Sequence, residues 1–138
     1  MQMSGLARKL VQAGVLDEQT AQRSSAEALK SREPFVRYLV TQGLARPNDV
    51  AIAAAEEFGV PLLDIDALDV DREVTKLVSE DLIRKHQALP IYQRGNRLYL
   101  AVADPTNLTA LDEIKFAVGR NTEAVIVEAD KLDRAIDH

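Results

Sequence analysis

Residues 88–119 read ALPIYQRGNRLYLAVADPTNLTALDEIKFAVG, and this stretch decides the fold of the second half of the chain. On either side of Gly95-Asn96, apolar residues recur at every second position, which is the period of a β-strand. Glycine accepts the positive φ that a tight hairpin turn requires, so this dipeptide predicts a two-residue turn. We therefore expect a hairpin with strands at 89–93 and 97–102.

The end of the same stretch predicts a helix. Pro105 has no N–H for a strand ladder, and Asn107 can cap a helix by accepting a hydrogen bond from a free backbone N–H. Apolar residues then recur at helical spacing as far as Gly119, which can end the helix. The β-branched residues of 123–127 predict a further strand. Together with the strand at 97–102 and the helix, this strand forms a strand–helix–strand crossover. A last helix is predicted to begin at Asp130.

The first 59 residues predict four short helices arranged as a tandem repeat. The pattern Leu-x-Arg-x-Leu-Val-x-x-Gly begins at Leu6 and recurs 29 residues later, at Phe35, with phenylalanine in first place. In each copy the glycine ends one helix and a second helix follows, with start signals at Asp17 and Pro47. Two helical pairs of this kind can bury their apolar faces together as a four-helix unit.

These elements predict an α+β protein of two domains, which meet at the Gly-Val-Pro sequence of residues 59–61. Residues 1–59 form the helical domain. Residues 60–138 form a small α/β sandwich with a three- to four-stranded sheet, in which 62–65 is the candidate fourth strand and Ser79 caps a helix. The charge divides at the same place, with seven basic and seven acidic residues up to residue 59 and ten basic and fifteen acidic residues beyond it.

The composition narrows the classes of function. A formal net charge of −5 argues against nonspecific binding to nucleic acid or to an anionic membrane. There is no cysteine, which excludes disulfides and cysteine-based metal sites, and no apolar run approaches the ~20 residues of a membrane span. The N-terminus lacks the basic and apolar regions of a signal peptide. We expect a cytoplasmic protein that does not insert into the membrane.

The sequence holds no motif for catalysis. None of the six glycines precedes a lysine, so the phosphate loop G-x-x-x-x-G-K-[ST] is missing. The aspartates of 64–71 do not follow the spacing of a calcium loop and are interpreted as a solvated acidic loop. We expect no enzyme activity, no cofactor and no metal. Arg94, Asn96 and Arg97 at the hairpin have two interpretations, a grip for an anion or a solvated turn whose charges deter edge-to-edge aggregation.

The stretch LPIYQRGNRLYLAVADPTNLTALDEIKF resembles the N-terminal domain of the traffic ATPases that drive type IV pilus extension (the PilB type) and type II secretion (the GspE type). The matching pieces are Arg94-Gly95-Asn96, Asp104-Pro105-Thr106-Asn107, Leu111-Asp112-Glu113-Ile114 and Val127-Glu128-Ala129-Asp130-Lys131-Leu132. The resemblance extends from about Leu6 to Ile136 and favours the pilus type. It implies a non-catalytic regulatory or docking domain, cut away from a hexameric ATPase motor.

The resemblance also implies partners and a location. One partner is a PilZ-type adaptor protein that docks on the N-terminal helices. The other is the inner-membrane platform or the cytoplasmic ring of the pilus machine. The implied location is the cytoplasm at the inner face of the bacterial inner membrane, and the implied process is pilus assembly and twitching motility.

An alternative function that the family implies is a sensor of cyclic di-GMP. Some relatives bind this nucleotide with a tandem motif, R-L-G-x-x-L-x-x-x-G-x-x-x-x-x-x-L-x-x-x-L-x-x-Q. Here the arginine, the first glycine and the glutamine are replaced in both copies. The replacing residues are Gly5, Ala7 and Ala28 in the first copy and Pro34, Val36 and Glu57 in the second. We therefore expect the helical scaffold to remain and the nucleotide site to be lost.

The repeat also selects candidate residues for binding a partner. Positions that are apolar in both copies are explained by a shared core. Apolar residues that break the match between the two copies have no such explanation. Tyr38, for example, corresponds to Lys9, so we expect Tyr38 to be at least partly exposed. The candidates for docking the adaptor are Leu16, Leu29, Val36 and Tyr38. The alternative is that they cap the edge of the helical core or pack on the second domain.

Overall fold

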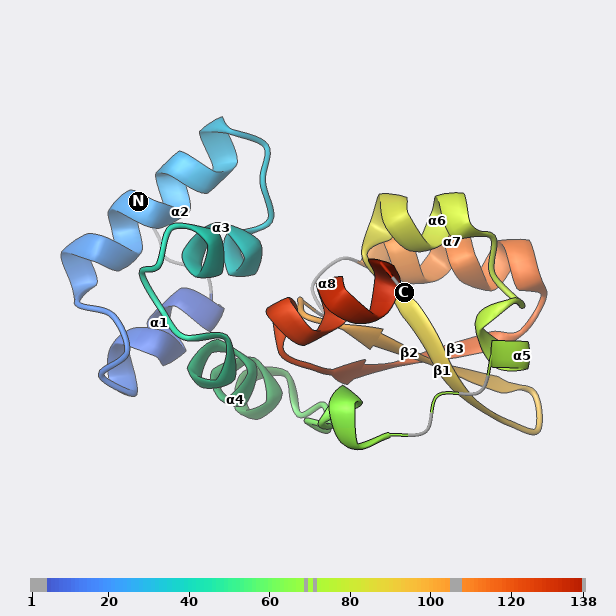
Figure 1. Cartoon of the computed structure of the whole chain (residues 1–138). Coiled ribbons are helices and arrows are strands. Elements are labelled where there is room, and N and C mark those ends of the chain that lie inside the picture. The colour runs from blue at the N-terminus through green and yellow to red at the C-terminus, as the bar shows by residue number, and fades with distance from the viewer. Residues whose placement is uncertain (1–4, 69, 71, 105–107, 138) are drawn as a thin grey trace.

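A computed structural model describes residues 5–68, 70, 72–104 and 108–137, with the backbone alone for 108–110. The expected cap at Asn107 therefore lies outside the described residues. Figure 1 shows two parts, a group of helices built from the first part of the chain and a sheet with further helices built from the second. This is the α+β fold that the sequence predicts.

Four helices form the first part, as expected. They are α1 (Gly5–Gln12), α2 (Glu18–Lys30), α3 (Phe35–Thr41) and α4 (Pro47–Phe58). Helix α1 packs against α2 and α4, and α2 packs against α3. The side chains that fill the space between them are small or aliphatic, because α4 contributes mainly alanines. The fully or nearly fully buried ones include Leu6, Ala7, Leu10, Leu16, Ala21, Ala28, Val36, Leu39, Val50, Ala51, Ala53 and Ala54.

The tandem repeat predicted from the sequence is confirmed in the backbone. Gly14 and Gly43, which occupy the same place in the two copies, have φ values of 75° and 70°, in the left-handed region that glycine tolerates best. In the first copy the N–H after this glycine donates to the Leu10 carbonyl at 3.0 Å, and in the second the corresponding N–H donates to the Leu39 carbonyl at 2.9 Å. The two copies thus turn in the same way for the same reason.

The predicted helix starts are also confirmed. The Thr20 N–H donates to Asp17 Oδ1 at 2.6 Å at the start of α2, and this hydrogen bond holds the pKa of the Asp17 carboxyl below its usual value. Pro47 is the first residue of α4, where the missing N–H costs no helical hydrogen bond. In the second part, the Leu82 N–H donates to Ser79 Oγ at 3.3 Å and begins α6.

The sheet has three strands in the order β1–β2–β3, which are β1 (Leu89–Arg94), β2 (Arg97–Val102) and β3 (Asn121–Ile126). β1 and β2 are antiparallel and joined by the predicted turn, in which Gly95 has a φ of 60°. β2 and β3 are parallel, and α7 (Leu108–Val118) connects them. The hairpin and the crossover are therefore both confirmed.

Several predicted boundaries differ from the structure, with β1 ending one residue later and β3 one residue earlier than expected. β3 begins at Asn121, two residues before the predicted start, because the Asn121 N–H donates to the Asn96 carbonyl at 3.1 Å and extends the pairing with β2 to its first residue. The final helix α8 (Ala129–Asp137) begins one residue early. Residues 62–65 form no full strand. Leu62 makes only an isolated parallel bridge to Ile126, and Ile65 already begins the 3₁₀ helix η1 (Ile65–Ala67).

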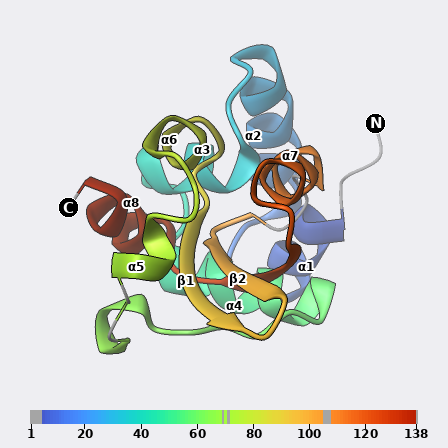
Figure 2. The same cartoon turned by 90° about the vertical axis from the view of Figure 1, so that its right-hand side faces the viewer.

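The two faces of the sheet are covered differently. Figure 1 shows α6 (Glu80–His86) and α7 on one side of the sheet, and the short α5 (Arg72–Thr75) beside β1. Leu98 and Leu100 of β2 are fully buried, as is Ile114 of α7. Because side chains of a strand alternate between faces, Arg97 and Tyr99 point to the opposite face. Figure 2 views the sheet from the hairpin end, with α8 to the left and α7 to the right of β1 and β2 in this view.

The helical core makes a stability prediction with a matched control. Leu39 is fully buried and Leu29 is 77% exposed, so both can be changed to alanine with opposite expectations. Leu39→Ala should lower the free energy of unfolding by about 2–5 kcal/mol because it leaves a cavity. Leu29→Ala should change it by less than about 0.5 kcal/mol. Urea unfolding followed by circular dichroism measures both values, and equal losses would contradict this core.

Candidate docking and ligand sites

The structure separates the four candidate docking residues into two pairs. Leu29 is exposed near the end of α2, and Tyr38 on α3 is partly exposed, as expected from its lysine counterpart. Leu16 and Val36 are only 6% and 2% exposed. They belong to the helical core and offer no surface to a partner, which is the alternative that the sequence left open. A docking role for Leu29 and Tyr38 stays a prediction.

The burial of Val36 could have been found in the sequence. Its counterpart in the first copy of the repeat is Ala7, which is also fully buried, so the register itself faces the core. Leu16 is buried because its N–H and that of Val15 both approach the Leu10 carbonyl, at 3.4 and 3.0 Å, which folds the turn back over α1. No pattern in a single sequence predicts this turn geometry, so the burial of Leu16 could not be found from the sequence.

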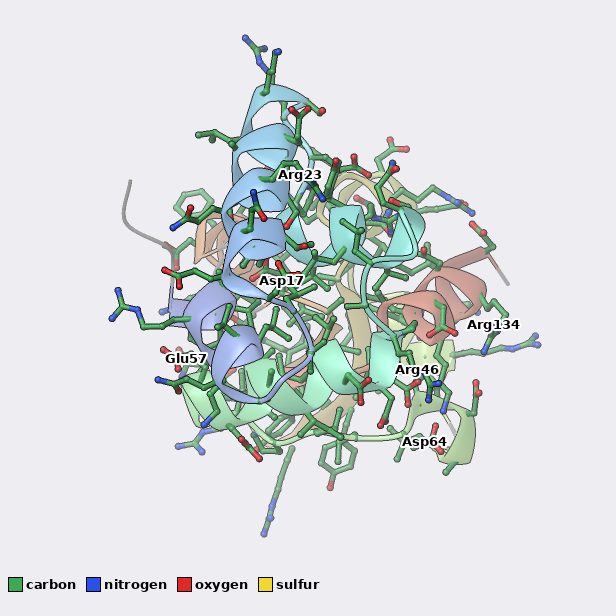
Figure 3. All side chains as sticks on the ribbon, turned by 90° about the vertical axis from the view of Figure 1, so that its left-hand side faces the viewer. Asp17, Arg23, Arg46, Glu57, Asp64 and Arg134 are labelled. Atoms are coloured by element: carbon green, nitrogen blue, oxygen red, sulfur yellow. The ribbon has the colours of Figure 1, made fainter. Side chains whose placement is uncertain are left out.

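Two of the positions that correspond to the nucleotide-binding motif meet in space. A Cβ atom built on Gly5 would lie 2.3 Å from Glu57 Oε1, so the arginine position of the first copy lies against the glutamine position of the second. Figure 3 shows Glu57 beside α1. A larger residue at position 5 would first have to displace the flexible end of the Glu57 side chain. The site thus presents a carboxylate where relatives with the motif carry an amide, and a glycine where they carry a cation.

A cavity of about 120 Å³ lies between the helical part and the α/β part. Apolar side chains of both parts, including Val36 and Leu132, form its floor, and charged or polar groups surround its opening. Arg37 lies at this opening, where its Nη2 atom donates to Gln87 Oε1 at 2.6 Å and also to Asp133. The remaining polar lining residues are Lys85, His86 and Asp104. The cavity is small, and its arginine is already engaged by groups of the same chain.

Further polar contacts lie around the start of helix α8, one of them to the helical part. Asn48 Nδ2 of α4 donates to Glu128 Oε1, just before α8, at 3.3 Å. Lys131 lies 3.1 Å from Asp64 and 3.2 Å from Glu128. The hydrogen bond with Lys131 lowers the pKa of Asp64, and the same bond raises the pKa of Lys131. Figure 3 shows Asp64 and Arg134 on one flank, away from Glu57. The acidic loop of the sequence is therefore partly neutralised by α8.

A second ionic link joins the helices above the sheet. His86 Nε2 lies 2.8 Å from Glu113 Oε2, and Lys85 lies 3.4 Å from the other oxygen of the same carboxylate. The hydrogen bond with His86 lowers the pKa of Glu113, and Lys85 acts in the same direction. This link fastens α6 to α7. Within the described residues, no group of three His, Cys, Asp or Glu side chains could hold a metal ion.

Comparison with known proteins identifies the family. The sequence model of the MshEN domain matches residues 58–138. The chain belongs to the MshEN domain family. It is 40% identical over 99% of its length to the type IV pilus assembly ATPase PilB of Pseudomonas aeruginosa, and 36% identical over 96% to PilB of Acinetobacter baylyi. It covers 24% and 23% of these two proteins, so it spans about a quarter of the length of the curated relatives it matches.

Solved structures confirm the fold of this MshEN domain. The N-terminal domain of XpsE matches with a TM-score of 0.81 and 24% identity, over 99% of this chain and 96% of that one. A structure of MshE with cdg matches with a TM-score of 0.76 and 22% identity, over 96% of both chains. The predicted family, the N-terminal domain of PilB- and GspE-type ATPases, is confirmed by the family model and the PilB relatives. Among the described residues, no helix is both long enough and apolar enough to span a membrane.

We propose residues 1–59 and 60–138 as the two structural units of this MshEN domain. The contacts between them come mainly from α3 and α4 on one side and α8 on the other, with Arg37 as the most connected polar link. Limited chymotrypsin digestion should cut first between residues 59 and 75, and Arg37→Ala should accelerate this cut. A single unfolding transition together with no cleavage in that segment would contradict the division.

Proposed function

We propose that this MshEN domain is the non-catalytic regulatory and protein-docking domain at the N-terminus of a type IV pilus extension ATPase. The observation that carries the proposal is the 40% identity to a pilus assembly ATPase over 99% of the chain. The domain precedes a hexameric motor, which hydrolyses the ATP. It acts in the cytoplasm at the inner face of the bacterial inner membrane, in contact with the membrane platform or the cytoplasmic ring of the pilus machine.

Within this function, the helical unit binds a PilZ-type adaptor through Leu29 and Tyr38. Both residues expose apolar surface, and they come from helices that pack against each other. Leu29 is 77% exposed and contributes nothing to the core, so the fold does not account for it. Tyrosine is enriched among residues that dominate binding energy at interfaces, because it combines a large rigid ring with a polar end.

The docking surface is tested with Leu29→Ala and Tyr38→Ala in a binding assay with the purified PilZ-type adaptor. Each change should weaken binding at least about fivefold, which is ~1 kcal/mol. Tyr92→Ala is the matched control, because Tyr92 is a 55% exposed tyrosine in the other unit and should leave adaptor binding unchanged. Circular dichroism establishes that all three variants are folded. Unchanged binding in both helical variants would place the adaptor elsewhere.

Sensing of cyclic di-GMP is the second candidate, and the similarity to MshE with cdg is what favours it. The residues argue against it, because both arginines and both glutamines of the motif are replaced. Each lost hydrogen bond to a charged group costs about 1.5–3 kcal/mol, so losing two reduces affinity at least a hundredfold.

Calorimetry should therefore detect no binding of cyclic di-GMP at low micromolar concentration, and the same protein should release no phosphate from ATP. A matched gain-of-function variant combines Gly5→Arg, Ala28→Gln, Pro34→Arg and Glu57→Gln, which restores the four missing groups. This variant should bind the nucleotide at least about tenfold more tightly than the natural sequence, or ~1.4 kcal/mol. Low micromolar binding by the natural sequence would overturn our assignment.

A further inference from the structure

An open patch lies on the face of the sheet opposite to Leu98 and Leu100. Residues that pair directly across neighbouring strands project from the same face, so the register defines two rows across the sheet. The pairs Tyr92–Tyr99 and Tyr99–Glu123 form one row, and the pairs Arg94–Arg97 and Arg97–Asn121 form the other. We call this patch the hairpin face, and its members are Tyr92, Arg94, Arg97, Tyr99, Asn121 and Glu123. All are exposed except Tyr99, which is partly exposed.

The aromatic row of the hairpin face is ordered before any partner arrives. The rings of Tyr92 and Tyr99 have centroids 5.6 Å apart and are inclined by 44°, a geometry within the range of favourable aromatic pairs. Tyr92 is nevertheless 55% exposed. A tyrosine ring that is already held by a neighbour loses little conformational freedom on binding. The pair therefore suits the centre of an interface.

The cationic row has no ion-pair partner among the described residues. Arg94 and Arg97 lie directly opposite each other, and like charges in this arrangement destabilise a strand pair. Neither forms an ion pair with any described residue. In contrast, ion pairs engage five other cations of the α/β part: Lys76, Arg84, Lys85, Lys131 and Arg134. A carboxylate from outside would remove the repulsion between the two arginines and supply the missing counter-charge.

The surrounding charges select the class of partner. Glu123 lies at the end of the aromatic row, and the chain as a whole has a formal charge of −5, so an extended polyanion such as nucleic acid or an anionic membrane is repelled around the patch. A protein segment, in contrast, can place a few carboxylates beside the two arginines and an apolar side chain beside Tyr92. We propose that the hairpin face is a docking surface for an acidic segment of a partner protein. Its carboxylates pair with Arg94 and Arg97, and an apolar side chain packs on Tyr92.

This surface lies on the other unit from the proposed adaptor site, and the two are tested independently. The probe is a fluorescein-labelled peptide, Gly-Asp-Glu-Leu-Asp-Glu-Phe-Asp-Gly, followed by fluorescence anisotropy at low salt. We expect saturable binding that weakens as salt is added. The double variant Arg94→Gln/Arg97→Gln should weaken binding at least about tenfold, and Tyr92→Ala about fivefold or more.

Two controls match these changes in chemistry. Arg23→Gln/Arg32→Gln removes the same charge from exposed arginines of α2 and the turn after it, and Phe116→Ala removes a 92% exposed aromatic ring from α7. Both should leave peptide binding unchanged, as should Tyr38→Ala. The proposal is overturned if the peptide does not bind, if its Asn/Gln counterpart binds equally well, or if the control variants lose as much affinity. Binding to phosphatidylglycerol vesicles or to oligothymidine in place of the peptide would also overturn it.

Discussion

The pairing of β2 on both of its edges is the constraint on which the α/β part depends. Its antiparallel partner β1 is reached by a two-residue turn, whereas its parallel partner β3 requires a crossover, and α7 supplies it. The crossover helix must cover one face of the sheet, which buries Leu98 and Leu100. On the opposite face at the hairpin end, the same topology leaves Tyr92, Arg94 and Arg97 exposed and Tyr99 partly exposed.

The position of helix α8 depends on β3, because α8 begins three residues after that strand ends. It lies against η1, α3 and α4, and it supplies the carboxylate for Arg37 and the ammonium group for Asp64. These side chains are all partly exposed, and exposed ion pairs contribute little to stability. The apolar contacts beneath them hold the two parts together, and Arg37 and Asn48 add polar links from the helical part to the α/β part.

The two proposed surfaces differ in their physical character. On the helical unit, Leu29 and Tyr38 offer apolar area, which suits docking by shape and apolar contact. On the sheet, Arg94 and Arg97, which form no ion pair with the described residues, lie beside an ordered tyrosine pair, and this suits recognition of carboxylates that responds to salt. A domain with both surfaces can bind two partners at once, one on each unit. That arrangement agrees with the regulatory role that we propose for this domain.

The sequence by itself determined what depends on neighbouring residues. Gly14, Gly43 and Gly95 mark turns because only their own φ matters, and Asp17 and Ser79 mark helix starts because each caps an N–H three residues away. The tertiary structure decided what depends on residues far apart in the chain. It extended β3 to Asn121 through pairing with β2, and it buried Leu16, which local pattern had left between core and surface. It also set Arg94 opposite Arg97 and Tyr92 beside Tyr99, because strand register and the choice of covered face are fixed by packing across the whole sheet.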